Sequence, residues 1–173
     1  MSNAAHAPLA QPVPDQDPEL PTVQANASED ARARLFWQRL SARPYQFDLM
    51  HSLRYLQARH PGLPRLGQAT RPKDEPLRLG QDPSLAFAPA TIAEILPSRA
   101  GEPERMTVWN FGLYGPNGPL PTHITEYVRE RLRQHDDATL ARFSDIFHHR
   151  MLLLLFRAWS DAQPTASLDR PGE

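Results

Sequence analysis

The sequence of 173 residues contains no cysteine, a single lysine and no long run of apolar residues. The lack of cysteine excludes a disulfide framework, a zinc–thiolate site and a cysteine nucleophile. The longest apolar run, 151–156, is far shorter than the roughly 20 residues that a membrane-spanning helix requires. The N-terminus shows neither the basic flank nor the apolar stretch of a secretory signal. We therefore expect a cytoplasmic protein without direct membrane insertion.

Charge of one sign is not concentrated enough to indicate a nucleic-acid-binding surface. The formal net charge is −1. Residues 1–30 carry five acidic side chains and no lysine or arginine, so the rest of the chain is moderately basic. A nucleic-acid-binding domain gathers its basic residues on one face, whereas here they are spread along the chain. We predict no nucleic-acid partner.

Glycine is scarce and proline is abundant, with 8 glycines against 19 prolines. Because proline breaks the interiors of helices and of central strands, this composition excludes a plain helical bundle along the whole chain. The prolines are concentrated near the N-terminus and between residues 61 and 121. Their distribution predicts five segments: a disordered or extended tail (1–27), N-terminal helices (28–60), a proline-rich β/loop insertion (61–121), a helical hairpin (122–163) and a second tail (164–173).

Apolar periodicity predicts about four helices in antiparallel packing. They are expected at 28–41 with Ser28 as the N-cap, at 45–59, from Pro121-Thr122 onward, and from Asp136-Asp137 to about 162. In the last helix we predict that the inward stripe consists of Leu140, Phe143, Phe147, Met151, Leu154 and Ala158. Between 151 and 156 this helix is apolar on every side, so either the fold encloses it there or another chain covers part of it.

Short strand-like pieces lie between the prolines of the insertion. They are Leu77–Leu79, Leu85–Phe87, Ile92–Leu96 and Met106–Phe111. Such short strands indicate a small β-subdomain rather than a large sheet. The predicted fold class is therefore α+β, mainly helical, with the proline-rich β/loop insertion as a foot-like subdomain.

The segment 112–121 is rich in glycine and proline and lies between a predicted strand and a predicted helix. A phosphate-binding P-loop would need a lysine after its last glycine, and none follows here. The residues Pro116-Asn117-Gly118 instead fit a tight turn, so we expect a rigid double turn. A rigid exposed loop loses little entropy on binding, so it serves equally well as a structural element or as a docking surface.

Asp145, His148 and His149 form a constellation that suggests catalysis, because an Asp and a His one helical turn apart can share a metal ion. The corresponding hypothesis is a metal-dependent hydrolase of unknown substrate. The spacing of a zinc-protease motif is missing, however. The alternative is that these polar residues bond to neighbouring backbone or to acidic groups at a helix crossing, and we favour that interpretation.

A set of short blocks carries a resemblance to a known family through its order along the chain. The blocks are Pro44–Asp48, Pro64–Gly67, Glu75–Leu79, Ser84–Phe87, Phe111–Pro121, Thr125–Tyr127, Asp145–Arg150 and Arg157–Trp159. Together they resemble the TssG family, also called VasB or ImpH, of bacterial type VI secretion systems. The resemblance covers about Leu35 to Asp169 and corresponds to roughly the N-terminal half of the longer family members.

The resemblance implies a structural baseplate subunit with no catalytic residues, metal or cofactor. Such a subunit forms a wedge with two TssF-like chains, meets TssK-like trimers and a TssE-like wedge subunit, and is assembled at the inner face of the bacterial inner membrane. Sheath and tube polymerise on this platform. Our hypothesis is that the helices bind TssF-like chains and the insertion docks TssK-like trimers. The expected partner-binding residues are Phe111, Gly112, Leu113, Tyr114, Gly115, Pro116, Asn117, Gly118, Pro119, Leu120, Pro121, Met151, Leu152, Leu155, Phe156 and Trp159.

One mutational expectation follows from this hypothesis. Replacing Leu113 and Tyr114 by aspartate should abolish capture of a TssK-like trimer while leaving the fold intact.

Overall fold

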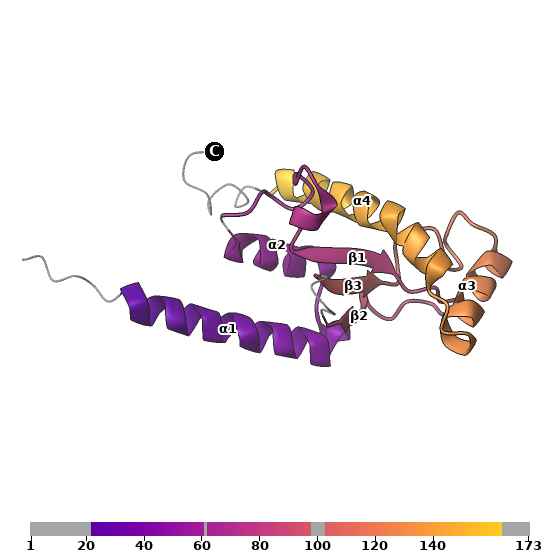
Figure 1. Cartoon of the computed structure of the whole chain (residues 1–173), viewed down its shortest axis with the longest axis horizontal. Helices are drawn as coiled ribbons and strands as arrows, with labels where there is room; N and C mark the ends of the chain where they lie inside the picture. Colours follow the sequence, from indigo (N-terminus) through magenta and orange to yellow (C-terminus); the bar gives the residue numbers. More distant parts are fainter. Residues whose placement is uncertain (1–21, 61, 98–102, 164–173) are drawn as a thin grey trace, which may run out of the picture. The chain divides into compact units, whose positions relative to one another are not determined.

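A computed structural model describes residues 22–60, 62–97 and 103–163 of the chain (Figure 1). The described residues form four α-helices, two short 3-10 helices and one three-stranded mixed sheet. This arrangement confirms the predicted α+β class with a mainly helical composition. The chain divides into two compact units whose boundary lies inside the first helix, with Phe36 as the first residue of the larger unit.

Helix α1 spans Thr22–Ala42 and begins earlier than the predicted start at Ser28. No proline interrupts the chain between Pro21 and Pro44, and the early part of this stretch is rich in alanine, the strongest helix former. Residues 22–27 are therefore helical rather than part of an extended tail. The rest of the predicted tail 1–27, residues 1–21, and the predicted tail 164–173 lie outside the described residues.

The second predicted helix is split in the structure. A 3-10 turn, η1, covers Pro44–Gln46, and helix α2 covers Leu49–Arg59. Phe47 between them is extended, and the Asp48 side chain caps α2 by accepting a hydrogen bond of 3.1 Å from the backbone N–H of His51. The side chain of an N-cap aspartate accepts a hydrogen bond from a backbone N–H of the first turn, which has no carbonyl partner within the helix. The helix therefore begins directly after the aspartate.

The sheet consists of β1 (Leu77–Gln81), β2 (Ile92–Leu96) and β3 (Glu104–Val108), preceded by a second 3-10 turn, η2 (Pro72–Asp74). Strand β3 lies in the centre, parallel to β1 and antiparallel to β2. The predicted strand at Leu85–Phe87 does not form. It lies between Pro83 and Pro89, neither of which can donate a backbone hydrogen bond to a neighbouring strand, and Phe87 is 84% exposed.

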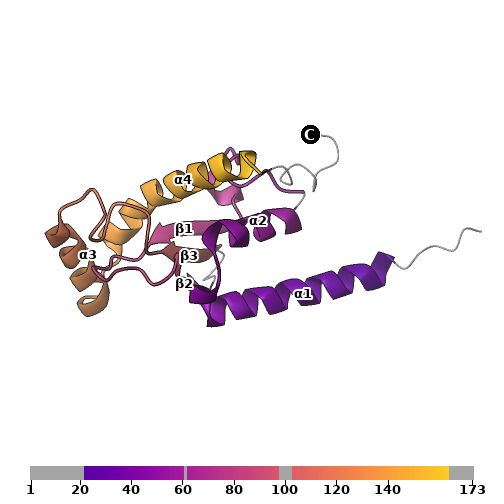
Figure 2. The ribbon, with the colours of Figure 1, turned by 180° about the vertical axis from the view of Figure 1, so that it is seen from behind.

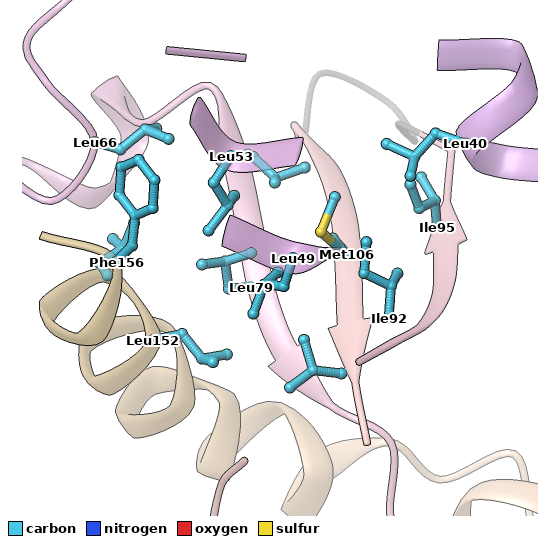
Figure 3. Packing of buried hydrophobic residues seen from close by; sticks show 13 residues of the cluster. Leu40, Leu49, Leu53, Leu66, Leu79, Ile92, Ile95, Met106, Leu152 and Phe156 are labelled. Carbon is cyan, nitrogen blue, oxygen red and sulfur yellow. The ribbon is translucent and has the colours of Figure 1, made fainter. Parts of the chain in front are cut away.

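Two further helices complete the fold, α3 (Thr122–Gln134) and α4 (Thr139–Asp161). Helix α4 lies along β1 in both views of the ribbon (Figures 1 and 2). Figure 3 shows side chains of α2, α4 and all three strands pointing toward one another in one core, including Leu53, Met106 and Phe156. The sheet formed within 61–121 therefore shares its main hydrophobic core with α2 and α4, whereas Val128 of α3 belongs to a second, smaller cluster with Tyr114 and Ala141.

The predicted inward stripe of α4 is wrong. Phe143, Phe147 and Leu154 are 57%, 49% and 46% exposed, respectively. The face that packs on the protein is instead partly polar and consists of Ala141, Ser144, Asp145, His148, Leu152, Leu153, Phe156 and Ser160. Hydrophobic periodicity favoured the more apolar side of the helix, whereas polar residues of the other side find hydrogen-bond partners inside the fold.

Candidate partner-binding surfaces

The loop between β3 and α3 is a double turn, as its glycines and prolines predicted. The backbone N–H of Gly118 donates to the carbonyl of Gly115 at 3.1 Å, which closes a turn with Pro116 in its second position. The N–H of Leu120 donates to the carbonyl of Leu113 at 3.2 Å and closes the wider loop. We refer to residues 111–121 as the glycine–proline loop.

The buried side chain of Gln81, at the end of β1, holds this loop in the way a neighbouring strand would. Its Oε1 accepts a hydrogen bond of 2.8 Å from the N–H of Tyr114, and its Nε2 donates one of 2.9 Å to the carbonyl of Tyr114. The lack of a side chain at Gly112 allows the Gln81 side chain to come this close to the loop backbone. Gly112 has a φ of +146°, and a Cβ at this position would lie 2.3 Å from Oε1 of Gln81.

Two more side chains anchor the residues on either side of Tyr114. The N–H of Leu113 donates to Nε2 of His148 at 3.0 Å, and the N–H of Gly115 donates to Oγ1 of Thr125 at 3.1 Å. The hydroxyl of Tyr114 also forms a hydrogen bond with the hydroxyl of Ser144. Three consecutive residues of the loop are thus fixed by side chains from β1, α3 and α4, so the loop is preorganised.

Asp145 connects this anchor to the sheet. Since Nε2 of His148 accepts a hydrogen bond, we assign the proton to Nδ1, which lies 3.1 Å from Oδ1 of Asp145. Oδ1 also accepts from the N–H of Gln81 at 3.1 Å, and Oδ2 accepts from the guanidinium of Arg105 at 2.7 Å. His148 is fully buried and Asp145 nearly so. This carboxylate therefore holds β1, β3 and α4 together.

His149 acts with Asp145 to cover the free edge of β1. Its Nδ1 accepts a hydrogen bond of 3.1 Å from the N–H of Leu79. Side chains four residues apart on a helix match alternate N–H groups of a strand, because both repeats advance about 6–7 Å. Burial lowers the pKa of His149 to about 4, with a further contribution from the positive charges of Arg78 and Arg105. The imidazole is therefore neutral at pH 7 and able to accept.

These bonds confirm the structural interpretation of Asp145, His148 and His149. All three bond to backbone or to one another, at the crossing of α4 with β1 and the glycine–proline loop. Within the described ranges, no group of three histidine, aspartate or glutamate side chains is arranged to hold a metal ion. Gln81 was not among the predicted site residues, because no local pattern in the sequence marks a glutamine that pairs with a distant loop.

A pocket of about 260 Å³ lies beside the glycine–proline loop. Its wall carries no charged side chain, and it combines residues 86–88 and 109–110 with parts of the loop. Phe87 on its rim is largely exposed, whereas Trp109 is fixed by a hydrogen bond of 2.9 Å from its Nε1 to Asp82. An uncharged pocket with an exposed aromatic rim favours an apolar side chain or a proline of a partner.

The residues of the glycine–proline loop that were predicted to bind partners differ in their exposure. Pro116, Asn117, Pro119 and Pro121 are exposed on the loop, but Tyr114 is 2% exposed and packs with Val128 and Ala141. The expectation that aspartate at Tyr114 would leave the fold intact is therefore wrong, because a charge there would be buried. Phe111, Gly112, Leu113, Gly118 and Leu120 are half-buried, and Gly115 is buried.

On α4, Leu152 and Phe156 have no exposed surface and belong to the core. Contrary to the expectation, they therefore do not face a partner. Met151 and Trp159 are half-buried, and Leu155 is exposed. Most of the exposed apolar side chains of α4 belong to the stripe that was predicted to face inward. We define this α4 apolar face by Phe143, Ile146, Phe147, Leu154 and Leu155.

An anchored loop and a helix with an exposed apolar face are features of a scaffold that binds other proteins. The chain belongs to the TssG family: residues 43–173 match the family model described as Type VI secretion, TssG. This family is a structural component of the type VI secretion baseplate and is not an enzyme family. No curated protein and no solved structure matches the chain. Among the described helices, none has the length and apolar character to cross a membrane.

Proposed function

We propose that this chain is the wedge scaffold of a type VI secretion baseplate, which holds two TssF-like chains and docks TssK-like trimers. A TssE-like subunit completes the wedge, and the platform assembles at the cytoplasmic face of the bacterial inner membrane. There it supports polymerisation of sheath and tube. The observation that carries the proposal is the α4 apolar face, because several large apolar side chains gathered on the exposed side of one helix are typical of a protein-binding surface.

The α4 apolar face is the proposed site for a TssF-like chain. Its aromatic members Phe143 and Phe147 contact each other with their ring centroids 5.6 Å apart, so they present one continuous surface. Complete burial of a large apolar side chain contributes about 1.5–3 kcal/mol, and these side chains are already about half buried. Covering four of them would therefore contribute roughly 3–6 kcal/mol to binding.

The glycine–proline loop is the proposed site for a TssK-like trimer. It needs little reordering on binding, since residues 113–115 are already held by side-chain hydrogen bonds. The prolines at its exposed tip have fixed φ angles, which reduces the entropy cost further. The neighbouring pocket with Phe87 on its rim offers an anchor point for one apolar group of the partner.

The two assignments are tested separately by co-purification with a TssF-like and with a TssK-like protein from the same genome. Phe147→Asp should abolish capture of the TssF-like chain, because it places a charge in the apolar contact. Tyr127→Asp is the matched control, since Tyr127 is an equally exposed aromatic residue on α3. If both variants are captured like the wild type, the α4 apolar face is not the TssF-like site.

For the loop, Phe87→Ala should weaken capture of the TssK-like trimer without changing capture of the TssF-like chain. The matched control is Tyr45→Ala, because Tyr45 is an exposed aromatic residue in η1, distant in sequence from the loop. Equal capture of the Phe87→Ala variant and the control would remove the pocket from the proposed docking site.

A further inference from the structure

A second pocket, of about 240 Å³, opens between β1, β3 and the N-terminal half of α4. Three arginines and a single carboxylate lie in its wall, so positive side chains outnumber negative ones there. The residues that line it are Arg78, Leu79, Arg105, Arg142, Asp145, Ile146 and His149. We refer to it as the arginine pocket.

The carboxylate in the arginine pocket is already fully engaged. Asp145 accepts hydrogen bonds from Gln81, His148 and Arg105. The guanidinium of Arg142 lies 3.8 Å from Oδ2 of Asp145, which is too long for a hydrogen bond. The Arg142 side chain is 48% exposed, so its fork of N–H donors is accessible to an acceptor from outside the chain.

His149 also lines this wall. Because its Nδ1 accepts from Leu79, its proton lies on Nε2. This Nε2 is buried and has no hydrogen-bond partner within the described residues. The wall thus combines an excess of positive charge with N–H donors, a combination that recognises an oxyanion.

We propose that the arginine pocket binds a carboxylate, supplied by an aspartate or glutamate side chain of the protein segment that covers the α4 apolar face. Ile146 belongs to both surfaces, being 65% exposed and also part of the pocket wall. A segment seated on Phe143 and Phe147 therefore brings its neighbouring residues to Arg142. The identity of the partner rests on the proposed function, whereas the preference for a carboxylate follows from the residues of the pocket itself.

The surroundings of the pocket favour a protein carboxylate over a phosphate of nucleic acid or lipid. A nucleic-acid backbone would leave the adjoining aromatic side chains uncovered. A membrane-binding helix presents its basic residues on an outward polar face, whereas Arg105 here is 18% exposed and held within a concave wall. Arginine also matches the planar carboxylate in a bidentate manner, which fits the fork of Arg142.

The test compares Arg142→Gln with the wild type in a binding titration against the TssF-like protein. Loss of one charge-assisted contact should weaken binding about tenfold, while the melting temperature should change little, because the ion pair of Arg142 with Asp145 is long, at 3.8 Å, and half-exposed on the arginine side. Arg129→Gln, an exposed arginine on α3, is the matched control and should bind like the wild type. Equal affinity of Arg142→Gln and the control overturns the carboxylate proposal but leaves the wedge function in place.

A second measurement tests the pocket without any assumption about the partner. The dipeptide N-acetyl-Glu-Leu-amide, added at millimolar concentration to the isotope-labelled chain, should shift the NMR signals of the Arg142 side chain and the Ile146 amide. The uncharged N-acetyl-Gln-Leu-amide should shift neither. Equal shifts with both peptides would refute carboxylate recognition. This result does not depend on whether the TssF-like protein binds, so it tests the pocket separately from the proposed function. Arg142-dependent binding to inorganic phosphate or to anionic phospholipid vesicles, with no response to the glutamyl peptide, also overturns the proposal.

Discussion

Replacing Gln81 by methionine tests whether one side chain holds the glycine–proline loop in place. Methionine keeps the length and approximate volume of glutamine but loses both hydrogen bonds to the backbone of Tyr114. Each buried backbone group left without a partner costs about 1–3 kcal/mol. The variant should therefore lose roughly 2–6 kcal/mol of unfolding free energy, unless the loop opens locally to hydrate these groups.

The assay combines thermal unfolding with amide hydrogen exchange. A loss of this size lowers the melting temperature by roughly 4–24 °C for a domain of this length. If the loop opens locally instead, the melting temperature falls less, and the amides of residues 113–115 lose their protection. Gln68→Met is the matched control, since Gln68 is exposed and away from the loop. Unchanged stability together with unchanged exchange at 113–115 would refute the idea that Gln81 fixes the loop.

Two further predictions concern the contact of α4 with β1. Gly80→Ala places a Cβ 2.6 Å from Oδ1 of Asp145, so it should cost about 1–3 kcal/mol in chemical denaturation, whereas Gly62→Ala, with open space around it, should not. The folded pKa of His149, about 4, lies below its ordinary value of 6.5. Between these values the unfolded chain binds a proton that the folded chain does not. The unfolding free energy should therefore decrease as the pH falls from about 6.5 to 4. His149→Gln should flatten this slope in denaturation experiments over that range, and an unaltered slope would contradict the burial of His149.

Local signals in the sequence were sufficient for much of the architecture. The start of α3 after Pro121 and the strand Ile92–Leu96 were predicted correctly, because each lies between clear breakers and carries a consistent apolar pattern. The piece at Leu85–Phe87 was equally apolar but wrong. A strand requires a partner to pair with, and no property of a three-residue segment reveals whether one is available.

The orientation of α4 illustrates what periodicity does not contain. The prediction turned Phe143 and Phe147 inward because they belong to the more apolar stripe. The helix instead packs with Asp145 and His148 inward, since the N–H groups of β1 and of the glycine–proline loop satisfy them. Those bonds join residues 35 to 64 positions apart in the chain, so no window along the sequence displays them.

The same error of orientation obscured the candidate surface. Leu152 and Phe156 were proposed as partner contacts because the helix is apolar there on every side. Only the structure shows which side faces the core, and it places Ile146 and Leu154 outward in their stead. The polar residues at 144, 145 and 148 lie on the opposite side of the helix from the exposed apolar residues. This polar cluster is the signal in the sequence that would have indicated an exposed apolar face.

The most direct test of the scaffold function is the molar mass of the complex formed with a TssF-like protein from the same genome. The two proteins are co-expressed and separated by size-exclusion chromatography with light scattering. We predict one discrete complex that contains more than one TssF-like chain for each copy of this chain. Two separate peaks, each from a soluble and folded protein, would contradict it.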